Sequence, residues 1–183
     1  MKNLVGNLLI APPAVKGNFF QKTVVMLTEH HNNGSIGLVL NKPSQVSIKS
    51  FAKQNSVILD LPGVVHIGGP VNSKALTMLH TSDWACDNTM YINEYFSISS
   101  SQEILSKMAM GYMPAKWRMF VGLCGWTKGQ LASELEGSPP YDRNQSWLTA
   151  TANHDIVFGF ETQTQWTESI ELAGSEFAQN LLA

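Results

Sequence analysis

The chain has 183 residues, of which 44% are hydrophobic and only 14% are charged. Its 12 Lys and Arg residues against 14 Asp and Glu residues give a formal net charge of −2. This composition excludes a disordered tail and a coiled coil, and its length favours one domain, so we expect residues 1–183 to fold as a single domain.

Charge and hydropathy along the chain exclude two further classes of protein. The Lys and Arg residues are scattered, and no cluster could neutralise a row of phosphates, so we do not expect direct nucleic-acid binding. The apolar run 8–11 is too short for a signal peptide, and no window approaches the ~20 apolar residues of a membrane span. We therefore expect a cytoplasmic protein, in which Cys86 and Cys124 are reduced thiols.

The N-terminal part of the sequence predicts a strand followed by a hairpin. Residues 8–11 form the strand, which ends at a double proline. Two continuous apolar runs, 24–27 and 36–40, flank Asn33-Gly34, a dipeptide typical of a tight hairpin turn. Because these runs are apolar at every position, we expect strands that are covered on both faces.

The rest of the chain alternates strand and helix signals, with no repeat and no linker. We expect hairpins as well as crossovers, hence a mixed sheet. The first predicted elements are a helix over 47–55 capped by Ser47, strands over 64–67, 77–80 and 89–98, and a helix that begins with a capping box of Ser100 and Glu103 and ends at Gly111. They are followed by a strand over 117–124, a helix over 127–136 ended by Gly137, a mobile loop over 138–146, a strand over 156–160 and a helix over 164–173.

Four blocks of sequence together resemble the AlgH/YqgE family, and they span nearly the whole chain. They are LLIAPP at 8–13, VVMLTEHHNNGSIGLVLNKP at 24–43, HIGGPV at 66–71 followed by LH at 79–80, and GLCGWTKGQLASEL at 122–135. The resemblance implies an α+β fold in which a mixed, bifurcated β-sheet curls into a pseudo-barrel with flanking helices. Some members of the family are named as transcriptional regulators, but the resemblance implies no reaction.

The motif blocks supply the candidate ligand or functional positions. We expect a site at the turns that these blocks form, while the catalytic residues stay unknown. The candidate positions are His30, Asn41, Gly68, Gly69, Pro70, His80, Cys124, Gly125, Trp126, Gly129, Gln130 and Glu134.

The sequence allows two interpretations of Cys124. If it lies at a strand end beside a helix start, amide dipoles can lower its pKa and create a reactive thiolate. The favoured reading is a small buried core residue, since free cysteine is among the most buried residue types. Gln130 and Glu134 share one helical face and either line a site or face solvent. Trp126 and Trp147 are either core aromatics or a patch for a partner.

The glycine turn and the histidines give weak signals for a ligand or a metal. Gly68-Gly69-Pro70 after a strand could offer backbone donors to an anion, but a structural turn is favoured. The chain has no Cys-x-x-Cys and no His-x-x-x-His, so we expect no metal and no cofactor. There is also no Gly-x-Ser-x-Gly motif for a serine hydrolase.

Three functions remain open. The first is a non-enzymatic regulatory or binding module, whose partner is a small molecule or a protein and whose surface grooves lie between the hairpin, the Gly68-Gly69-Pro70 turn and the GWTKGQL turn. The second is an enzyme or thiol-based sensor near those turns, using His30, Asn41, His80, Glu134 or Cys124. The third is a transcriptional regulator that acts indirectly. The sequence leaves the oligomeric state open.

The scattered charge makes a direct prediction about DNA. At physiological salt, we expect the protein to bind duplex DNA no better than a neutral control protein of similar size, because no basic surface releases counterions. A gel-shift titration at several salt concentrations measures this. A shift whose affinity falls steeply with salt would contradict the expectation.

Overall fold

A computed structural model of the protein describes residues 4–141 and 146–182. The chain divides into two compact units, unit 1 (Met1–Asn41 with Cys124–Ala183) and unit 2 (Lys42–Leu123). Strand β9 (Trp117–Thr127) contributes residues to both. The single domain predicted over residues 1–183 stays a prediction.

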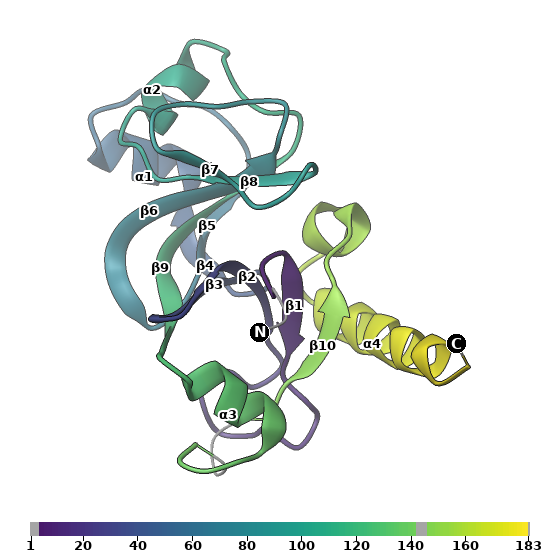
Figure 1. The fold of residues 1–183 in the computed structure, drawn as a ribbon. Helices are drawn as coiled ribbons and strands as arrows, with labels where there is room; N and C mark the ends of the chain where they lie inside the picture. Colours follow the sequence, from purple (N-terminus) through teal and green to yellow (C-terminus); the bar gives the residue numbers. More distant parts are fainter. Residues whose placement is uncertain (1–3, 142–145, 183) are drawn as a thin grey trace. The chain divides into compact units, whose positions relative to one another are not determined.

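Unit 1 contains an antiparallel sheet in the order β10-β1-β2-β3-β9, as Figure 1 shows. It also carries two α-helices and one turn of π-helix. These elements are β1 (Asn7–Ile10), β2 (Val24–His31), β3 (Gly34–Val39), α3 (Gln130–Glu136), β10 (Leu148–Thr151), η1 (Asp155–Gly159) and α4 (Gln165–Leu182).

Unit 2 is built around the first part of β9, which pairs with β6 in an antiparallel and with β5 in a parallel arrangement. β8 and β7 continue the sheet beyond β6, and β4 pairs with β5. The elements are β4 (Pro43–Ser47), α1 (Ile48–Gln54), β5 (Val64–Ile67), β6 (Val71–Thr81), β7 (Thr89–Tyr91), β8 (Phe96–Ser99) and α2 (Ile104–Ala109).

The sheet is therefore mixed and divides at β9 into two branches. Residues of β9 up to Leu123 pair with β5 and β6, and residues from Cys124 onward pair with β3. Helices flank the strands of each branch (Figure 1). The α+β class with a mixed, bifurcated sheet is confirmed.

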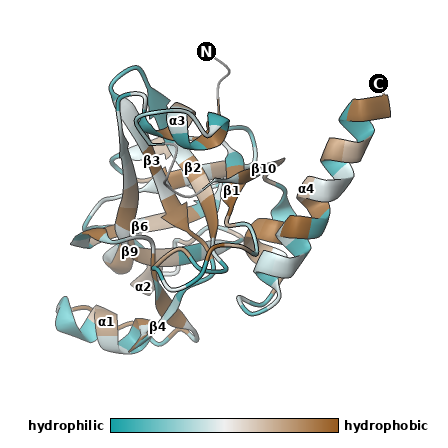
Figure 2. Ribbon diagram, turned by 90° about the horizontal axis from the view of Figure 1, so that it is seen from below, coloured by the Kyte–Doolittle hydropathy of each residue, from teal (hydrophilic) through white to brown (hydrophobic). Residues whose placement is uncertain are grey.

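Each unit has its own core. In unit 1 the strands shown brown in Figure 2 bury residues 24–27 completely, so the strand covered on both faces is confirmed. The buried cluster of this unit comprises Leu9, Ala11, Val25, Leu27, Val39, Cys124, Trp126, Leu131 and Trp147. The buried cluster of unit 2 comprises Ile48, Ala52, Leu59, Val65, Met78, Ile104, Leu105, Met108 and Met119.

Several predicted elements are confirmed with shifted ends. Ser47 caps α1, since its side chain accepts a hydrogen bond of 3.1 Å from the Ser50 amide. The predicted box of Ser100 and Glu103 does not form. Instead the Ser101 hydroxyl accepts from the Glu103 amide at 3.1 Å, and α2 begins only at Ile104. The predicted mobile loop over 138–146 falls partly on residues 142–145, which lie outside the described residues.

Two strand predictions are wrong because side-chain amides redirect the backbone. Residues 89–98 form two strands rather than one, since the Asn93 side chain accepts hydrogen bonds from the Tyr95 and Phe96 amides, each at 2.9 Å, and makes a turn. Residues 156–159 of the predicted strand 156–160 belong to η1, and Phe160 follows it. There the Asn153 side chain accepts from the Ile156 amide at 2.9 Å, and Gln165 donates to the Ile156 carbonyl at 2.6 Å.

The hairpin also differs from its predicted turn. β2 and β3 are joined by Asn32 and Asn33, and Gly34 is already the first residue of β3, paired with His31. Glycine is required at position 34 because a Cβ there would overlap the carbonyl oxygen of Trp126 on β9. The residue serves strand packing rather than the turn.

Gly122 within β9 is the second position where the backbone requires glycine. Its φ is +76°, and a Cβ would lie 2.5 Å from the carbonyl oxygen of Gly69. The positive φ and the close carbonyl oxygen both involve residues of unit 2. Together they fix the path of β9 beside the turn that follows β5.

We therefore expect Gly122→Ala to destabilise the protein by more than the ~1–2 kcal/mol that a left-handed backbone conformation costs a residue with a Cβ. Gly125→Ala on the same strand is the control, because no atom lies within 4 Å of its Cβ position and it should change stability by no more than ~0.5 kcal/mol. Urea unfolding of both variants measures the difference, and equal midpoints would contradict it.

Candidate functional site

Glu134 is the centre of a buried hydrogen-bond network in unit 1. The side chain is only 5% exposed, so it does not face solvent. Its Oε2 accepts hydrogen bonds from the indole N–H groups of Trp126 and Trp147, each at 2.9 Å. Its Oε1 accepts from Gln130 Nε2 at 3.0 Å. A buried carboxylate needs such donors, and here Trp126 and Gln130 come from the same sequence motif as Glu134, while Trp147 comes from outside it.

Gln130 extends the same network to the end of β9. Its Oε1 accepts from the Thr127 amide at 3.0 Å and from the Thr127 hydroxyl at 3.2 Å. Gly129, with a φ of +77°, precedes the first residue of α3. The predicted helix over 127–136 therefore begins late, because Thr127 still belongs to β9. The GWTKGQL segment ties a strand end to a short helix.

Trp126 and Trp147 are core residues. They are 6% and 7% exposed, and their ring centroids lie 6.2 Å apart in an edge-to-face arrangement. The surface patch considered for these two residues is wrong, because the indole N–H groups point inward to Glu134.

Cys124 does not have the surroundings of a reactive thiol. It lies inside β9, three residues before the strand ends, and is 1% exposed. Burial raises the pKa of the thiol to about 12, because the charged thiolate loses its hydration. The predicted position beside a helix start is wrong. Gly125, the next residue, is exposed and leaves space around its Cβ position.

The turn at Gly68-Gly69-Pro70 in unit 2 makes its contacts with neighbouring residues of the fold. The Gly68 amide donates to the Val121 carbonyl at 2.9 Å, and the Gly69 carbonyl contacts Gly122. Pro70 has no N–H. With the Gly68 donor used and the Pro70 donor missing, this turn does not form the anion cradle.

The polar candidates His80 and Asn41 also have internal partners. His80 is fully buried; its Nδ1 bonds with the Thr81 carbonyl and its Nε2 with the Ser99 hydroxyl, both at 2.8 Å. Burial lowers the pKa of this imidazole, so it is neutral at physiological pH. The Asn41 side chain donates to the Lys22 carbonyl at 2.8 Å and accepts from the Val24 amide at 3.0 Å, which joins two segments of unit 1.

His30 lines a cavity of about 340 Å³ in unit 1, formed by the hairpin and the GWTKG segment. Its Nδ1 lies 2.8 Å from the Ser35 hydroxyl. Gly129 is the other candidate position on this cavity, so the structure brings two of the twelve together there. Its lining comprises His30, His31, Asn32, Gly34, Ser35, Thr127, Lys128, Gly129, Leu131 and Ala132.

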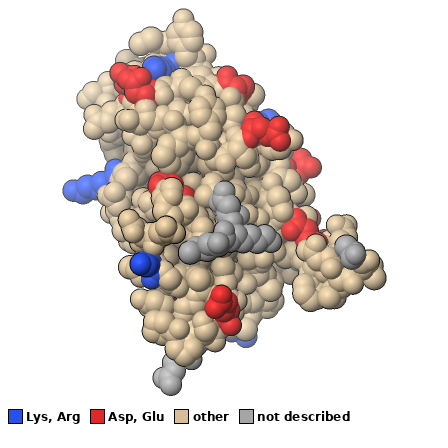
Figure 3. All heavy atoms as spheres, viewed as in Figure 1, with Lys and Arg blue, Asp and Glu red and all other residues tan. Residues whose placement is uncertain are grey.

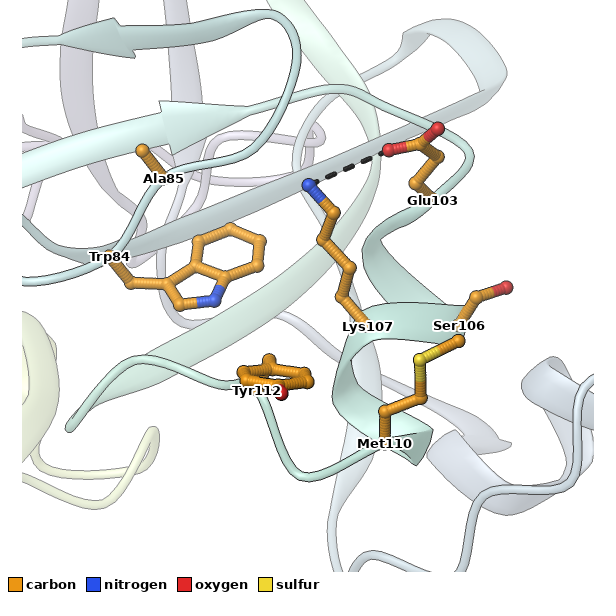
Figure 4. Close-up of a pocket in the computed structure, with 7 residues that line it drawn as sticks. All are labelled: Trp84, Ala85, Glu103, Ser106, Lys107, Met110 and Tyr112. Carbon is orange, nitrogen blue, oxygen red and sulfur yellow. Dashed lines mark ion pairs between the residues drawn. The ribbon is translucent and has the colours of Figure 1, made fainter.

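A larger cavity, which we call the Trp84 groove, lies in unit 2 and has a volume of about 690 Å³. Figure 4 shows Trp84 and Tyr112 on one side and the residues of α2 on the other, with the Lys107 ammonium 3.6 Å from the Glu103 carboxylate. Its lining comprises Trp84, Ala85, Glu103, Ser106, Lys107, Met110 and Tyr112. Met110 and Tyr112 are 71% and 67% exposed.

No residue of the Trp84 groove was among the positions predicted from the sequence. A signal was present: Trp84 stands in a polar segment, and Met110 and Tyr112 flank the glycine that closes a helix. In this chain, apolar side chains outside the periodic core pattern lie at the surface. The motif glycines, in contrast, allow segments of backbone to pack closely.

Two features bear on metal and nucleic-acid binding, namely the grouping of metal-binding side chains in the described residues and the spread of basic side chains on one face of the molecule. Within residues 4–141 and 146–182, no three His, Cys, Asp or Glu residues are grouped to hold a metal ion. On the face shown in Figure 3, the Lys and Arg side chains lie apart from one another. No helix in the described ranges has the length and apolar character needed to cross a membrane.

Fold and site together define an α+β protein with a mixed, bifurcated sheet, in which Trp126, Gln130 and Glu134 of one motif bond to one another. The sequence model of a family described as AlgH-like matches residues 8–178. The chain belongs to this family.

Relatives and solved structures agree with this assignment over nearly the full length. The chain is 31% identical to the UPF0301 protein of Shewanella oneidensis, covering 96% of this chain and 94% of that protein. It is similar to the solution structure of the AlgH protein from Pseudomonas aeruginosa, with a TM-score of 0.76, 29% identity, and coverage of 95% and 93%. A crystal structure of a Corynebacterium diphtheriae protein, 22% identical over 92% and 86%, shares the fold with a TM-score of 0.68.

The burial of Cys124 makes a prediction about thiol reactivity. We expect an alkylating reagent at near-neutral pH to label Cys86, which is partly exposed, much faster than Cys124 in the folded protein. Mass spectrometry of timed samples distinguishes the two sites, and both should react at similar rates in denaturant. Fast labelling of Cys124 in the folded state would restore the thiol-sensor reading.

Proposed function

We propose that this chain is a non-enzymatic binding module that recognises a segment of a partner protein in the Trp84 groove. The observation that supports this most directly is the set of large apolar side chains, Trp84, Met110 and Tyr112, around one open cavity. Exposed apolar surface of this kind is unfavourable in water, so binding of an occupant that removes it from water is favourable.

A protein segment suits this groove better than a small molecule. Small ligands gain affinity when a pocket buries most of their surface, roughly 70–90% of it. Met110 and Tyr112 are themselves 71% and 67% exposed, so the groove covers an occupant on one side only. A partner protein can bury further surface around the rim, where a small molecule cannot.

The wall of the groove is held in place before any partner binds. Trp84 packs edge-to-face on the buried ring of His80, with centroids 5.1 Å apart. The neighbouring Asp83 accepts a hydrogen bond from the Thr81 hydroxyl at 2.5 Å and one from the Ala115 amide at 3.0 Å. The Thr81 hydroxyl lowers the pKa of Asp83 and keeps this carboxylate charged. A pre-ordered aromatic wall loses little entropy on binding.

The rim supplies charged groups of both signs. The Lys107 ammonium and the Glu103 carboxylate form a partly exposed pair, and the Ser106 hydroxyl lies beside them on α2. Such rim groups contribute orientation and selectivity more than affinity. A partner segment with an apolar anchor and flanking polar residues matches this arrangement.

This proposal includes a regulatory role only in its indirect form, in which the chain acts on transcription through a protein partner. We place the module in the cytoplasm. Support for that location comes from Cys86 and Cys124, neither of which forms a disulfide in the structure.

The test uses the full chain and a random peptide display library as the probe. Peptides selected on the wild-type protein should bind Tyr112→Ala and Met110→Ala roughly tenfold or more weakly, since exposed anchors at an interface centre contribute most of its affinity. Tyr91→Ala and Tyr95→Ala are matched controls, because both tyrosines are exposed in unit 2 and do not line the groove.

Fluorescence anisotropy with the selected peptides measures these affinities. Selected peptides that bind all four variants equally would contradict the proposal, as would a library that yields no binder for the wild-type protein. Circular dichroism of each variant checks that the fold is retained.

A further inference from the structure

Helix α4 carries an apolar stripe along its whole length. Trp166, Ile170, Ala173, Phe177 and Leu181 recur at spacings of three and four residues, which places them on one helical face. In its first half this face packs on unit 1, where Ala173 is buried and the Trp166 indole donates to the Ala11 carbonyl at 2.7 Å. α4 contacts β1, β2, β10 and η1.

The second half of the same stripe has no such cover. Phe177, Leu181 and the neighbouring Leu182 are 66%, 71% and 89% exposed. Figure 2 shows the hydrophobic last turn of α4 lying beyond the strands of unit 1. The apolar face that packs on unit 1 in the first half of α4 is therefore exposed to solvent in the second half.

The charges on α4 all have one sign. The helix contains Glu168, Glu171 and Glu176, and its sequence has no Lys, Arg or His. Glu176 also holds the helix to the edge of the sheet, because its carboxylate accepts from the Thr151 amide at 3.1 Å. Glu168 and Glu171 lie in the first half of the helix and Glu176 lies in the exposed half, so the exposed stripe continues an acidic helix.

We propose that the second half of α4 is a docking surface for a basic amphipathic helix of another protein. An i, i+4 ridge such as Phe177 and Leu181 packs into the groove of a facing helix, and basic residues beside the partner's apolar face complement the glutamates. A second copy of α4 fits less well, because it brings glutamates toward glutamates. An anionic membrane surface is repelled for the same reason.

This surface belongs to unit 1 and shares no residue with the Trp84 groove of unit 2. The proposal therefore goes beyond the proposed function, and either one can fail while the other holds. Phe177 and Leu181 are exposed, so replacing them removes the docking surface without removing core packing.

The experiment compares two synthetic amphipathic peptides of identical leucine pattern, one with lysine and one with glutamate at the polar positions. At about 0.15 M salt the Debye length of about 8 Å screens long-range attraction but leaves charges in contact interacting, so the wild-type chain should bind the Leu/Lys peptide more tightly than the Leu/Glu peptide. The double variant Phe177→Ser with Leu181→Ser should bind the Leu/Lys peptide roughly tenfold or more weakly. The control Gln179→Ser with Asn180→Ser changes exposed polar residues of the same turns and should bind like the wild type.

Anisotropy measures the peptide affinities, and circular dichroism confirms that each variant is folded. Equal binding of the Leu/Lys peptide to the double variant would show an attraction by charge alone and overturn the proposal. So would a wild-type dimer in sedimentation that the double variant converts to a monomer, because a second copy would then cover the stripe.

Discussion

Backbone pairing along β9 is the constraint on which both units depend. Its first residues complete the sheet of unit 2 between β5 and β6, and its last residues complete the sheet of unit 1 beside β3. Gly122 and Gly34 keep this pairing possible, because a Cβ at either position would overlap a carbonyl oxygen of a neighbouring segment. A change that displaces β9 therefore disturbs hydrogen bonds in two sheets at once.

The motif residues mostly serve this framework. Glu134 accepts hydrogen bonds from Gln130 and from the indoles of Trp126 and Trp147 where β9 ends and α3 begins. Removing one donor would leave part of a buried carboxylate without a partner, which costs more than an ordinary hydrogen bond contributes. The resemblance to a family rests on blocks that include Trp126, Gln130 and Glu134, and these residues hold the fold together, so a function must be sought in groups that the framework leaves free.

Local signals in the sequence predicted what local chemistry determines. The apolar runs gave the strands of the hairpin, and Ser47 gave the start of α1, because periodicity and capping act over a few residues. Prediction failed where a side-chain amide bonds to the backbone and redirects it, at Asn93 within the run 89–98 and at Gln165, nine residues beyond Ile156. Gln165 donates to the Ile156 carbonyl and stabilises a helical turn in a run that has strand composition. The Trp84 groove was missed since its walls come from separate segments of unit 2.

Exposure of apolar groups has a different meaning on each of the two proposed surfaces. In the groove, Trp84 is fixed by the ring of His80, so its orientation is settled before a partner arrives. On α4, the backbone is fixed by the packing of Ala173 and Trp166, while Phe177 and Leu181 stay free to adapt. In both cases the backbone is already ordered in the folded protein. Covering the exposed apolar side chains therefore lowers the free energy without a further entropy cost for ordering the backbone. Rigid support beneath uncovered apolar side chains is the physical basis of the proposal that this molecule binds other proteins.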